Sequence, residues 1–402
     1  MALIKYTELA RHVLLEGVDE TMRHLGAHLR AGKLKPADFS LRELAESLIV
    51  DRSGEPCGRE WVRSIGPRQG TGYVRLESID AVDSTAFSNI TGQIVFSELM
   101  QGYSQAAFIG DQLVRTIPTK LITETMPGIN EVSDNDGEIH EGMPYPQVGF
   151  GEDWVETPKT TKRGLIIAVT KEAIFFDRTG QILDRARSVG DVLRRRKEKL
   201  ILRGVLGLIN NFKWKGTTYN TYLAAGSWIN QKSGNGIDES AGWRNIDVSE
   251  QIFNDMVHPD TGEPITVTPN AILHMPARTQ HFRRVFNATE LRTQNAVAGD
   301  VVITANTVTN YSLLQSRFAY RELIAAGEAS GKAADWWLHG DFKRAFAWME
   351  NWPVQVVQAP PNSEAEFRQD IAVQFKASER GAFAVLEPRA VVRNYATSDI
   401  IS

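Results

Sequence analysis

The chain has 402 residues, of which 42% are hydrophobic and 23% are charged, a composition typical of a soluble protein with a well-packed core. This length is enough for two or three domains. The net charge of −4 is too small to indicate a protein that binds nucleic acid over its whole surface. The single cysteine, Cys57, excludes an internal disulfide bond and favours a reducing compartment. No segment approaches the roughly 18 apolar residues of a membrane-spanning helix, so we expect no contact with a membrane.

The N-terminal segment predicts two short helices. Apolar residues recur at near-helical spacing through residues 7–31, and a second helix is expected to start at Ser40. Ser40 and Glu43 have the spacing of a capping box, in which the serine hydroxyl accepts a hydrogen bond from the backbone N–H three residues later. Two short helices cannot form a core alone, so this segment needs a partner surface.

The next part of the chain has mixed patterns. Residues 87–110 alternate in places and are partly helical, which is more typical of an arm than of a domain. Residues 113–125 follow, and their last seven positions, residues 119–125, are expected to form a β-strand.

Residues 126–162 are rich in glycine and proline and have little helical or core pattern. A loop of this length inside a compact domain is usually functional. Its acidic centre, Asp134, Asn135, Asp136 and Gly137, has three interpretations. A calcium loop fails, because aligning the glycine leaves Val132 and Met143 where acidic ligands are needed. A metal site has no second ligand cluster to support it, and a solvated hairpin tip is therefore favoured.

The segment Gly164–Ile209 has the longest helical pattern in the chain. It starts with an apolar run that predicts a strand, and a turn is expected at residues 177–180. After this turn, apolar residues recur every three or four positions, which predicts a helix of about 28 residues and roughly 42 Å. Lys197 interrupts this apolar stripe.

A basic run surrounds that interruption, namely Arg194, Arg195, Arg196, Lys197 and Lys199. Acidic residues at helical distances make a solvated face one interpretation of this run. On a long exposed helix the same side chains could instead contact DNA phosphates without sequence preference, or an acidic patch on another subunit. The sequence leaves these alternatives open.

The remaining chain predicts short alternating elements. A helix is expected at residues 249–258, a buried strand at 269–276 and a helix at 277–286. Near the C-terminus we expect strands at 346–349, 354–358, 371–376 and 383–392, the last one interrupted by Pro388. Strands and helices joined by short connections favour an α/β or α+β domain.

No catalytic, cofactor-binding or metal-ligating residues are predicted. The sequence has no phosphate-binding loop, no dinucleotide-binding glycine pattern, no nucleophile elbow and no zinc-protease motif. His258, His274 and His281 lie in separate expected elements and are more typical of packed or surface side chains. For a chain of this length, this silence favours a structural role over an enzymatic one.

The order of these segments resembles the major capsid proteins of tailed bacteriophages, with the Hong Kong ninety-seven-type capsid fold. The resemblance covers about residues 80–397 and depends on order rather than on one motif. A long glycine- and proline-rich loop returns through Val169-Thr170-Lys171-Glu172 into a long helix. Gly340-Asp341-Phe342 and then Arg380-Gly381 and Glu387-Pro388-Arg389-Ala390-Val391-Val392 follow near the C-terminus.

The resemblance implies an α+β fold with named parts. These are a helical, scaffold-like or retained segment at 1–75, an N-terminal arm at 76–118, the extended E-loop at 119–165, a P-domain with the long spine helix at 166–212, an A-domain at 213–339, P-domain strands at 340–380 and a return strand at 381–402. In relatives the N-terminal segment can be removed by a protease, and whether this happens here stays open.

The resemblance also implies a function. We expect a non-enzymatic, cofactor-free major capsid protein that assembles in the host cytoplasm as pentamers and hexamers of an icosahedral virion shell around double-stranded DNA. Portal and scaffolding proteins would be its partners. One alternative is an encapsulin, a cellular compartment with the same fold that holds an enzyme cargo. An alternative of another class is a soluble α+β enzyme or binding protein.

Overall fold

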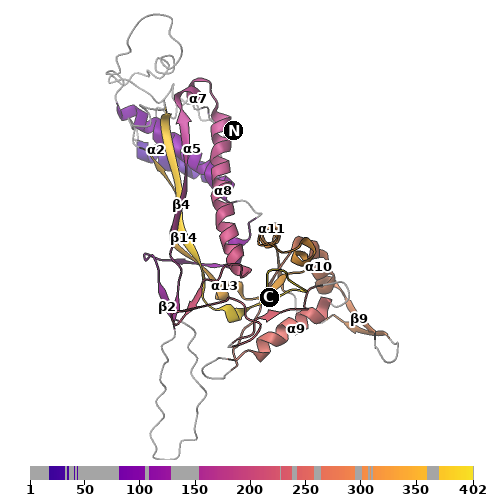
Figure 1. Cartoon of the computed structure of the whole chain (residues 1–402). Helices are drawn as coiled ribbons and strands as arrows, with labels where there is room; N and C mark the ends of the chain where they lie inside the picture. The colour runs from indigo at the N-terminus through magenta and orange to yellow at the C-terminus, as the bar shows by residue number, and fades with distance from the viewer. Residues whose placement is uncertain are drawn as a thin grey trace, which may run out of the picture. The chain divides into compact units, whose positions relative to one another are not determined.

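The computed structural model in Figure 1 describes residues 18–31, 34–35, 40, 43, 81–104, 108–127, 154–226, 228–237, 242–257, 264–294, 301–306, 308, 311–359 and 371–401. The chain divides into two compact units. Unit 1 contains residues 1–105, 162–195 and 352–380, and unit 2 contains residues 106–161, 196–351 and 381–402. Helix α8 (Thr179–Val205) and strands β13 (Phe346–Gln358) and β14 (Ile371–Val385) each contribute residues to both units.

Unit 1 packs helices against a small sheet with strand order β13-β14-β4. Its other elements are α2 (Val18–Arg30), α5 (Ala81–Tyr103), β4 (Thr161–Thr170) and α7 (Lys171–Phe175). Successive side chains of a strand point to opposite faces. Ile167 and Val169 of β4 are accordingly buried with Ile94 and Leu99 of α5, whereas Ile166 is 63% exposed. One face of this sheet therefore carries the core of unit 1.

The N-terminal predictions are confirmed where the structure describes them. The side chains of Leu25 and Leu29 on α2 are buried in the core of unit 1, so this helix has the partner surface that it was expected to need. The hydroxyl of Ser40 accepts a hydrogen bond from the backbone N–H of Glu43 at 3.3 Å, as a capping box requires. Most of the rest of residues 1–75, with Cys57, lies outside the described residues.

Three local predictions differ from the structure. Residues 81–103 form the continuous helix α5, where the sequence predicted a pattern that is only partly helical. Strand pairing at 113–125 is limited to β1 (Arg115–Pro118) and the start of β2 (Thr125–Pro127), because residues 119–124 bend. The strand after Gly164 ends at Thr170, whose hydroxyl caps α7 by accepting the N–H of Ala173 at 3.3 Å. A short helix therefore precedes the turn into α8.

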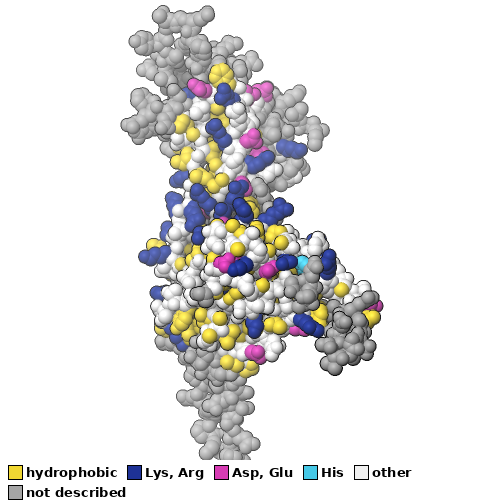
Figure 2. All heavy atoms as spheres, turned by 45° about the vertical axis from the view of Figure 1, so that its right-hand side comes forward, with side chains coloured by type: hydrophobic (Ala, Val, Ile, Leu, Met, Phe, Trp, Pro, Cys, Tyr) yellow, Lys and Arg dark blue, Asp and Glu magenta, His cyan; other side chains and the backbone are white. Residues whose placement is uncertain are grey.

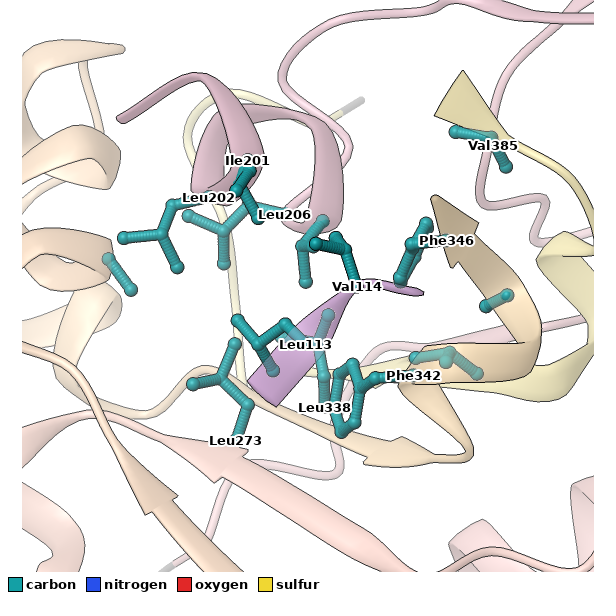
Figure 3. Packing of buried hydrophobic residues seen from close by; sticks show 14 of the residues in the cluster. Leu113, Val114, Ile201, Leu202, Leu206, Leu273, Leu338, Phe342, Phe346 and Val385 are labelled. Carbon is teal, nitrogen blue, oxygen red and sulfur yellow. The ribbon is translucent and has the colours of Figure 1, made fainter. Parts of the chain in front are cut away.

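The largest core of the chain lies in unit 2, and Figure 3 shows part of it. Leu113 and Val114 meet Leu202 of α8 and Leu206 just after it there, together with Phe342. All five side chains are at most 3% exposed. These residues are far apart in sequence, so the packing of the end of α8 fixes several chain segments at once.

Unit 2 contains a mixed sheet in the order β11-β8-β12-β15-β7 and an antiparallel sheet in the order β2-β3-β5-β6. Two-stranded pairing joins β9 to β10, and β1 runs parallel to β13. The elements of unit 2 not yet given are α6 (Gly110–Leu113), β3 (Trp154–Glu156), β5 (Phe212–Trp214), β6 (Thr217–Tyr219), β7 (Gln231–Lys232), α9 (Gly242–Asp255), β8 (Ala271–His274), η3 (Pro276–Arg278), α10 (Thr279–Asn287), β9 (Glu290–Gln294), β10 (Val301–Ala305), β11 (Ser312–Gln315), α11 (Arg317–Ala325), α12 (Ser330–Ala334), β12 (Trp337–Gly340), α13 (Phe342–Ala345), η4 (Pro388–Ala390) and β15 (Val391–Asn394).

The predictions for unit 2 were right about most element types and less accurate about boundaries. The strand expected within 269–276 is β8, whose four side chains are all buried, and a helix follows it as expected. The helix expected from Ser249 starts earlier, at Gly242. Gly381 was expected to precede a new strand, but β14 runs through it without a break. A Cβ at Gly381 would come within 2.7 Å of the Trp348 ring, so the glycine serves close packing.

Candidate functional site

The stem of the glycine- and proline-rich loop is held in an antiparallel sheet of unit 2. Strand β2 leads into the loop and pairs with β3, which leads out of it, and β3 in turn pairs with β5. The backbone N–H of Thr157 donates to the Glu124 carbonyl at 2.8 Å, and the Thr157 hydroxyl accepts the N–H of Glu124 at 2.8 Å. The predicted tip residues, Asp134, Asn135, Asp136 and Gly137, lie outside the described residues.

Helix α8 confirms the prediction of a long helix, since it has 27 residues. Its end carries a glycine cap. Gly207 has a φ of 72°, and the N–H of Leu208 donates to the Arg203 carbonyl at 2.9 Å while that of Gly207 donates to the Gly204 carbonyl at 3.0 Å. This is the Schellman pattern, in which a left-handed glycine lets the chain turn back on the last helical carbonyls.

The basic run on α8 is not one solvated face. Arg194 in unit 1 is 4% exposed and lies over the Tyr103 ring, with its guanidinium carbon 5.5 Å from the ring centroid. Lys197 in unit 2 is 6% exposed, lies 5.0 Å from the Trp348 ring centroid and is 3.5 Å from the Asp111 carboxylate. These two members are therefore structural. Long basic side chains can cover aromatic rings with their stems and guanidinium groups.

The other three members of the run are exposed, namely Arg195, Arg196 and Lys199. Arg195 forms an ion pair with Asp191 one turn earlier, and the Lys199 ammonium is 3.6 Å from the Glu322 carboxylate. Exposed ion pairs of this kind contribute about 0–1 kcal/mol and exchange readily for other partners. Figure 2 shows a face of the molecule on which Lys and Arg side chains gather with few Asp or Glu side chains among them.

Glu198 points to the buried side of α8, where its carboxylate binds backbone N–H groups. Its carboxylate, fully buried, accepts the N–H of Ile109 at 3.0 Å and that of Gly110 at 2.8 Å. A Cβ at Gly110 would lie 2.5 Å from this carboxylate, so glycine permits the close approach. The acidic side chain fixes the start of α6 on the second half of α8.

Arg393 is a buried structural residue whose role the sequence did not reveal. Its guanidinium donates to the Leu206 carbonyl at 3.0 Å, just beyond the end of α8, and to the side-chain oxygen of Gln231. It also lies 4.5 Å from the Tyr222 ring centroid and 5.4 Å from that of Trp336. Burial lowers the pKa of Arg393 to about 10. A cation near the C-terminal end of a helix is stabilised by the helix dipole.

The histidines that the structure describes belong to no cluster that could hold a metal ion. Among the described residues, no three His, Cys, Asp or Glu side chains gather in an arrangement that could hold a metal ion. His274 is buried and its Nδ1 lies 3.0 Å from the Met275 carbonyl, while His281 lies beside Arg278, with 3.2 Å between Nε2 and Nη1. His258 lies outside the described residues. The described helices include none long and apolar enough to cross a membrane.

One known protein family matches most of the segment that carries these features. The family model described as phage capsid protein matches residues 154–394, which is more than half of the chain. The chain belongs to the phage capsid protein family. The matched part contains β3, all of α8 and every strand of the mixed sheet β11-β8-β12-β15-β7.

Solved capsid structures resemble this capsid protein. Mycobacterium phage Ogopogo has 13% identity and a TM-score of 0.40, and the match covers 73% of this chain and 94% of that one. The capsid of a native GTA particle has 12% identity and a TM-score of 0.43, covering 73% and 91%. The SrpI encapsulin complex of Synechococcus elongatus has 13% identity and a TM-score of 0.41, covering 84% and 95%. No curated protein sequence matches the chain significantly.

Membership of this family confirms the α+β capsid fold of the Hong Kong ninety-seven type and the structural function predicted from the order of the segments. The protein is a major capsid protein of the virion that self-assembles into a shell, and its family is structural rather than enzymatic. The boundaries of the arm, E-loop, P-domain and A-domain stay predictions. So do the contacts of the loop tip and of the exposed basic residues.

Proposed function

We propose that this capsid protein assembles as pentamers and hexamers into an icosahedral shell around double-stranded phage DNA. Assembly takes place in the host cytoplasm, with scaffolding and portal proteins as partners. The observation that carries the proposal is the family match over residues 154–394, which contains all of α8 and every strand of the mixed sheet of unit 2.

The E-loop supplies the adaptable contact between subunits in this proposal. Residues 128–153 contain seven acidic residues and no lysine or arginine. Because β2 and β3 anchor both ends of this segment, a neighbouring subunit that binds it is fixed relative to unit 2. We expect Asp134, Asn135, Asp136 and Gly137 to lie on a neighbouring subunit. Arg195, Arg196 and Lys199 are the exposed members of the run that can meet DNA phosphates or an acidic segment of another copy.

Negative-stain electron microscopy of the purified protein tests the function directly. We expect closed shells of uniform size, or pentamers and hexamers that convert into such shells. A protein that stays monomeric under all assembly conditions would contradict the proposal. Shells that are isolated from the native source with an enzyme inside, and without DNA, would favour the encapsulin alternative.

Deletion of residues 130–150 tests the E-loop. The anchored stem lies outside the deletion, so we expect a folded subunit that fails to form closed shells. A matched variant keeps the length of the loop and changes its seven acidic residues to the corresponding amides. Loss of shells in both variants would assign the contact to charge, and loss in the deletion alone would assign it to length and shape. Normal shells from the deletion variant would refute the E-loop assignment.

A further inference from the structure

Two large apolar side chains, Leu121 and Ile122, project from the stem of the E-loop. Each is 57% exposed. Ten large hydrophobic side chains are exposed in the described part of the chain, and among these only Leu121 and Ile122 are consecutive in sequence. Single exposed apolar residues are normal in soluble proteins, whereas apolar side chains that lie together on a surface often mark an interaction site.

The bend that carries this pair is held by the body of unit 2. The N–H of Thr119 donates to the Glu350 carbonyl at 2.9 Å, and the hydroxyl of Thr119 accepts the N–H of Leu121 at 3.1 Å. On the other side, the N–H of Thr160 donates to the Ile122 carbonyl at 2.9 Å. The bend is therefore bonded to β13, to itself and to the strand that returns from the loop.

Asn351 makes the central contact to the bend. Its side-chain amide donates to the Thr119 carbonyl at 2.9 Å and to the Leu121 carbonyl at 3.0 Å. One amide group thus binds two carbonyls that are two residues apart, which fixes the curvature of the backbone between them. The backbone of the bend is thus bonded to the body of unit 2, while the two apolar side chains that it carries stay exposed.

This arrangement is difficult to explain in an isolated subunit. Exposed apolar surface is unfavourable in water, and ordering a surface bend has an entropic cost. A bend that is already ordered can instead bind a partner without losing that entropy at the moment of contact. The observations therefore favour a contact surface that is prepared before the partner arrives.

We propose that the stem bend, residues Thr119–Glu124, is a contact between subunits, in which Leu121 and Ile122 are covered by a second copy of this chain. Asn351 is the positioning residue of this contact. The inference rests on the proposed shell function, because a protein that self-assembles supplies its own copies as the partners at highest local concentration. It assigns an apolar contact at the stem, separate from the acidic segment of the loop.

The test compares shell assembly by the full chain and by the double variant Leu121→Ser/Ile122→Ser. We expect the double variant to keep the unfolding midpoint of the wild-type subunit, because both side chains are exposed. The protein concentration at which half of the subunits enter shells, followed by light scattering and sedimentation, should rise at least tenfold. The swap Leu121→Ile/Ile122→Leu keeps the apolar surface and should assemble within twofold of wild type.

Two further variants make the test specific. Ile303→Ser removes a side chain of similar exposure, 54%, from β10 and should leave assembly within twofold of wild type. Asn351→Asp removes the amide donor without changing the apolar surface, and it should weaken assembly while the subunit stays folded.

The outcomes separate the two levels of the argument. If the wild-type chain forms no shells, the proposed function fails before the stem bend is tested. If the wild type assembles and Leu121→Ser/Ile122→Ser assembles at the same concentration, the stem bend is not a subunit contact. An equal loss for Ile303→Ser would also overturn the assignment, because the effect would then follow from any exposed apolar side chain.

Discussion

The two halves of α8 are held by different kinds of contact. In unit 1, Gly190 meets α5 backbone to backbone: a Cβ there would lie 2.1 Å from the Leu99 carbonyl oxygen. Gly102 of α5 is equally close, since its Cβ would lie 2.2 Å from the Arg187 carbonyl oxygen. In unit 2, by contrast, side chains bind backbone. Glu198 accepts two N–H groups and Arg393 donates to the carbonyl of Leu206.

This difference shows two ways of fixing a long helix. A backbone contact between helices depends on the absence of side chains, so it is sensitive to one methyl group and insensitive to pH. A buried polar contact depends on charge and on complete hydrogen bonding, because an unsatisfied buried group costs about 1–3 kcal/mol. Substitutions and acid should therefore affect the two halves differently.

The largest effect is expected for Arg393→Ala. The substitution leaves the Leu206 carbonyl and the Gln231 side chain without their donor, and it opens a space beside the Tyr222 ring. Hydrogen bonds to charged groups contribute about 1.5–3 kcal/mol each, so we expect a loss of about 3–5 kcal/mol in the free energy of unfolding. Denaturant titration of the unassembled subunit measures it.

The matched control is Arg203→Ala, which removes an arginine from the last turn of α8. Its side chain is 51% exposed and 3.7 Å from the Glu322 carboxylate. This change should alter the free energy of unfolding by no more than about 0.5 kcal/mol. Equal effects of the two substitutions would mean that the buried contact of Arg393 contributes nothing special to the end of α8.

The next effect is a loss of stability in acid that comes from unit 2. Burial lowers the pKa of His339 from 6.5 to about 3. Between these values the unfolded chain binds a proton that the folded chain does not, so the stabilisation is complete above pH 6.5 and is lost as pH falls toward 3. Between pH 7 and pH 4.5 the contribution of His339 falls by about 2–3 kcal/mol.

Denaturant titration of the subunit at several pH values measures this slope, and His339→Gln should make it shallower. Hydrogen exchange at pH 4.5 should show the change in the amides around Ser249, whose hydroxyl lies 3.3 Å from Nδ1 of His339. For the amides of α5, the difference between the free energy of local opening and that of global unfolding should be the same at both pH values. A loss of protection at pH 4.5 that is confined to unit 1 would contradict the expected difference between the two halves of α8.

The sequence predicted α8 well because 27 residues of regular apolar spacing give a strong signal. The sequence did not predict that Lys197, which interrupts the apolar stripe, is buried. The partners that bury this residue, Trp348 and Asp111, are distant in sequence, and a basic side chain gives no local sign that its stem will lie on an aromatic ring. Arg393 was missed for the same reason. The signal that could have located the end of the helix was Gly207.

The loop stem shows a second limit of prediction from sequence. Residues 119–125 were predicted to form a strand, yet most of them bend, and Asn351 and Thr160 bind their carbonyls. A local pattern of side chains indicates the type of secondary structure, but it does not indicate which backbone carbonyls a distant residue will bind. The exposed pair Leu121 and Ile122 could therefore be identified only from the structure.

The smallest effect, and the sharpest in sign, is expected for the substitution of single glycines in the first half of α8. Alanine is favoured over glycine in a helix by up to about 1 kcal/mol. At Gly180 a Cβ would meet nothing within 4 Å, so Gly180→Ala should stabilise the subunit by a few tenths of a kcal/mol to about 1 kcal/mol. At Gly190 the same methyl group would collide with the backbone of α5, and overpacking of this kind costs about 1–3 kcal/mol.

We therefore expect Gly190→Ala to lower the free energy of unfolding and Gly180→Ala to raise it, although both place the same residue in the same helix. Hydrogen exchange should locate the loss in α5 and the first half of α8. If Gly190→Ala stabilises the subunit as Gly180→Ala does, α5 does not press on α8 through its backbone. The first half of the helix would then be held mainly by its apolar side chains.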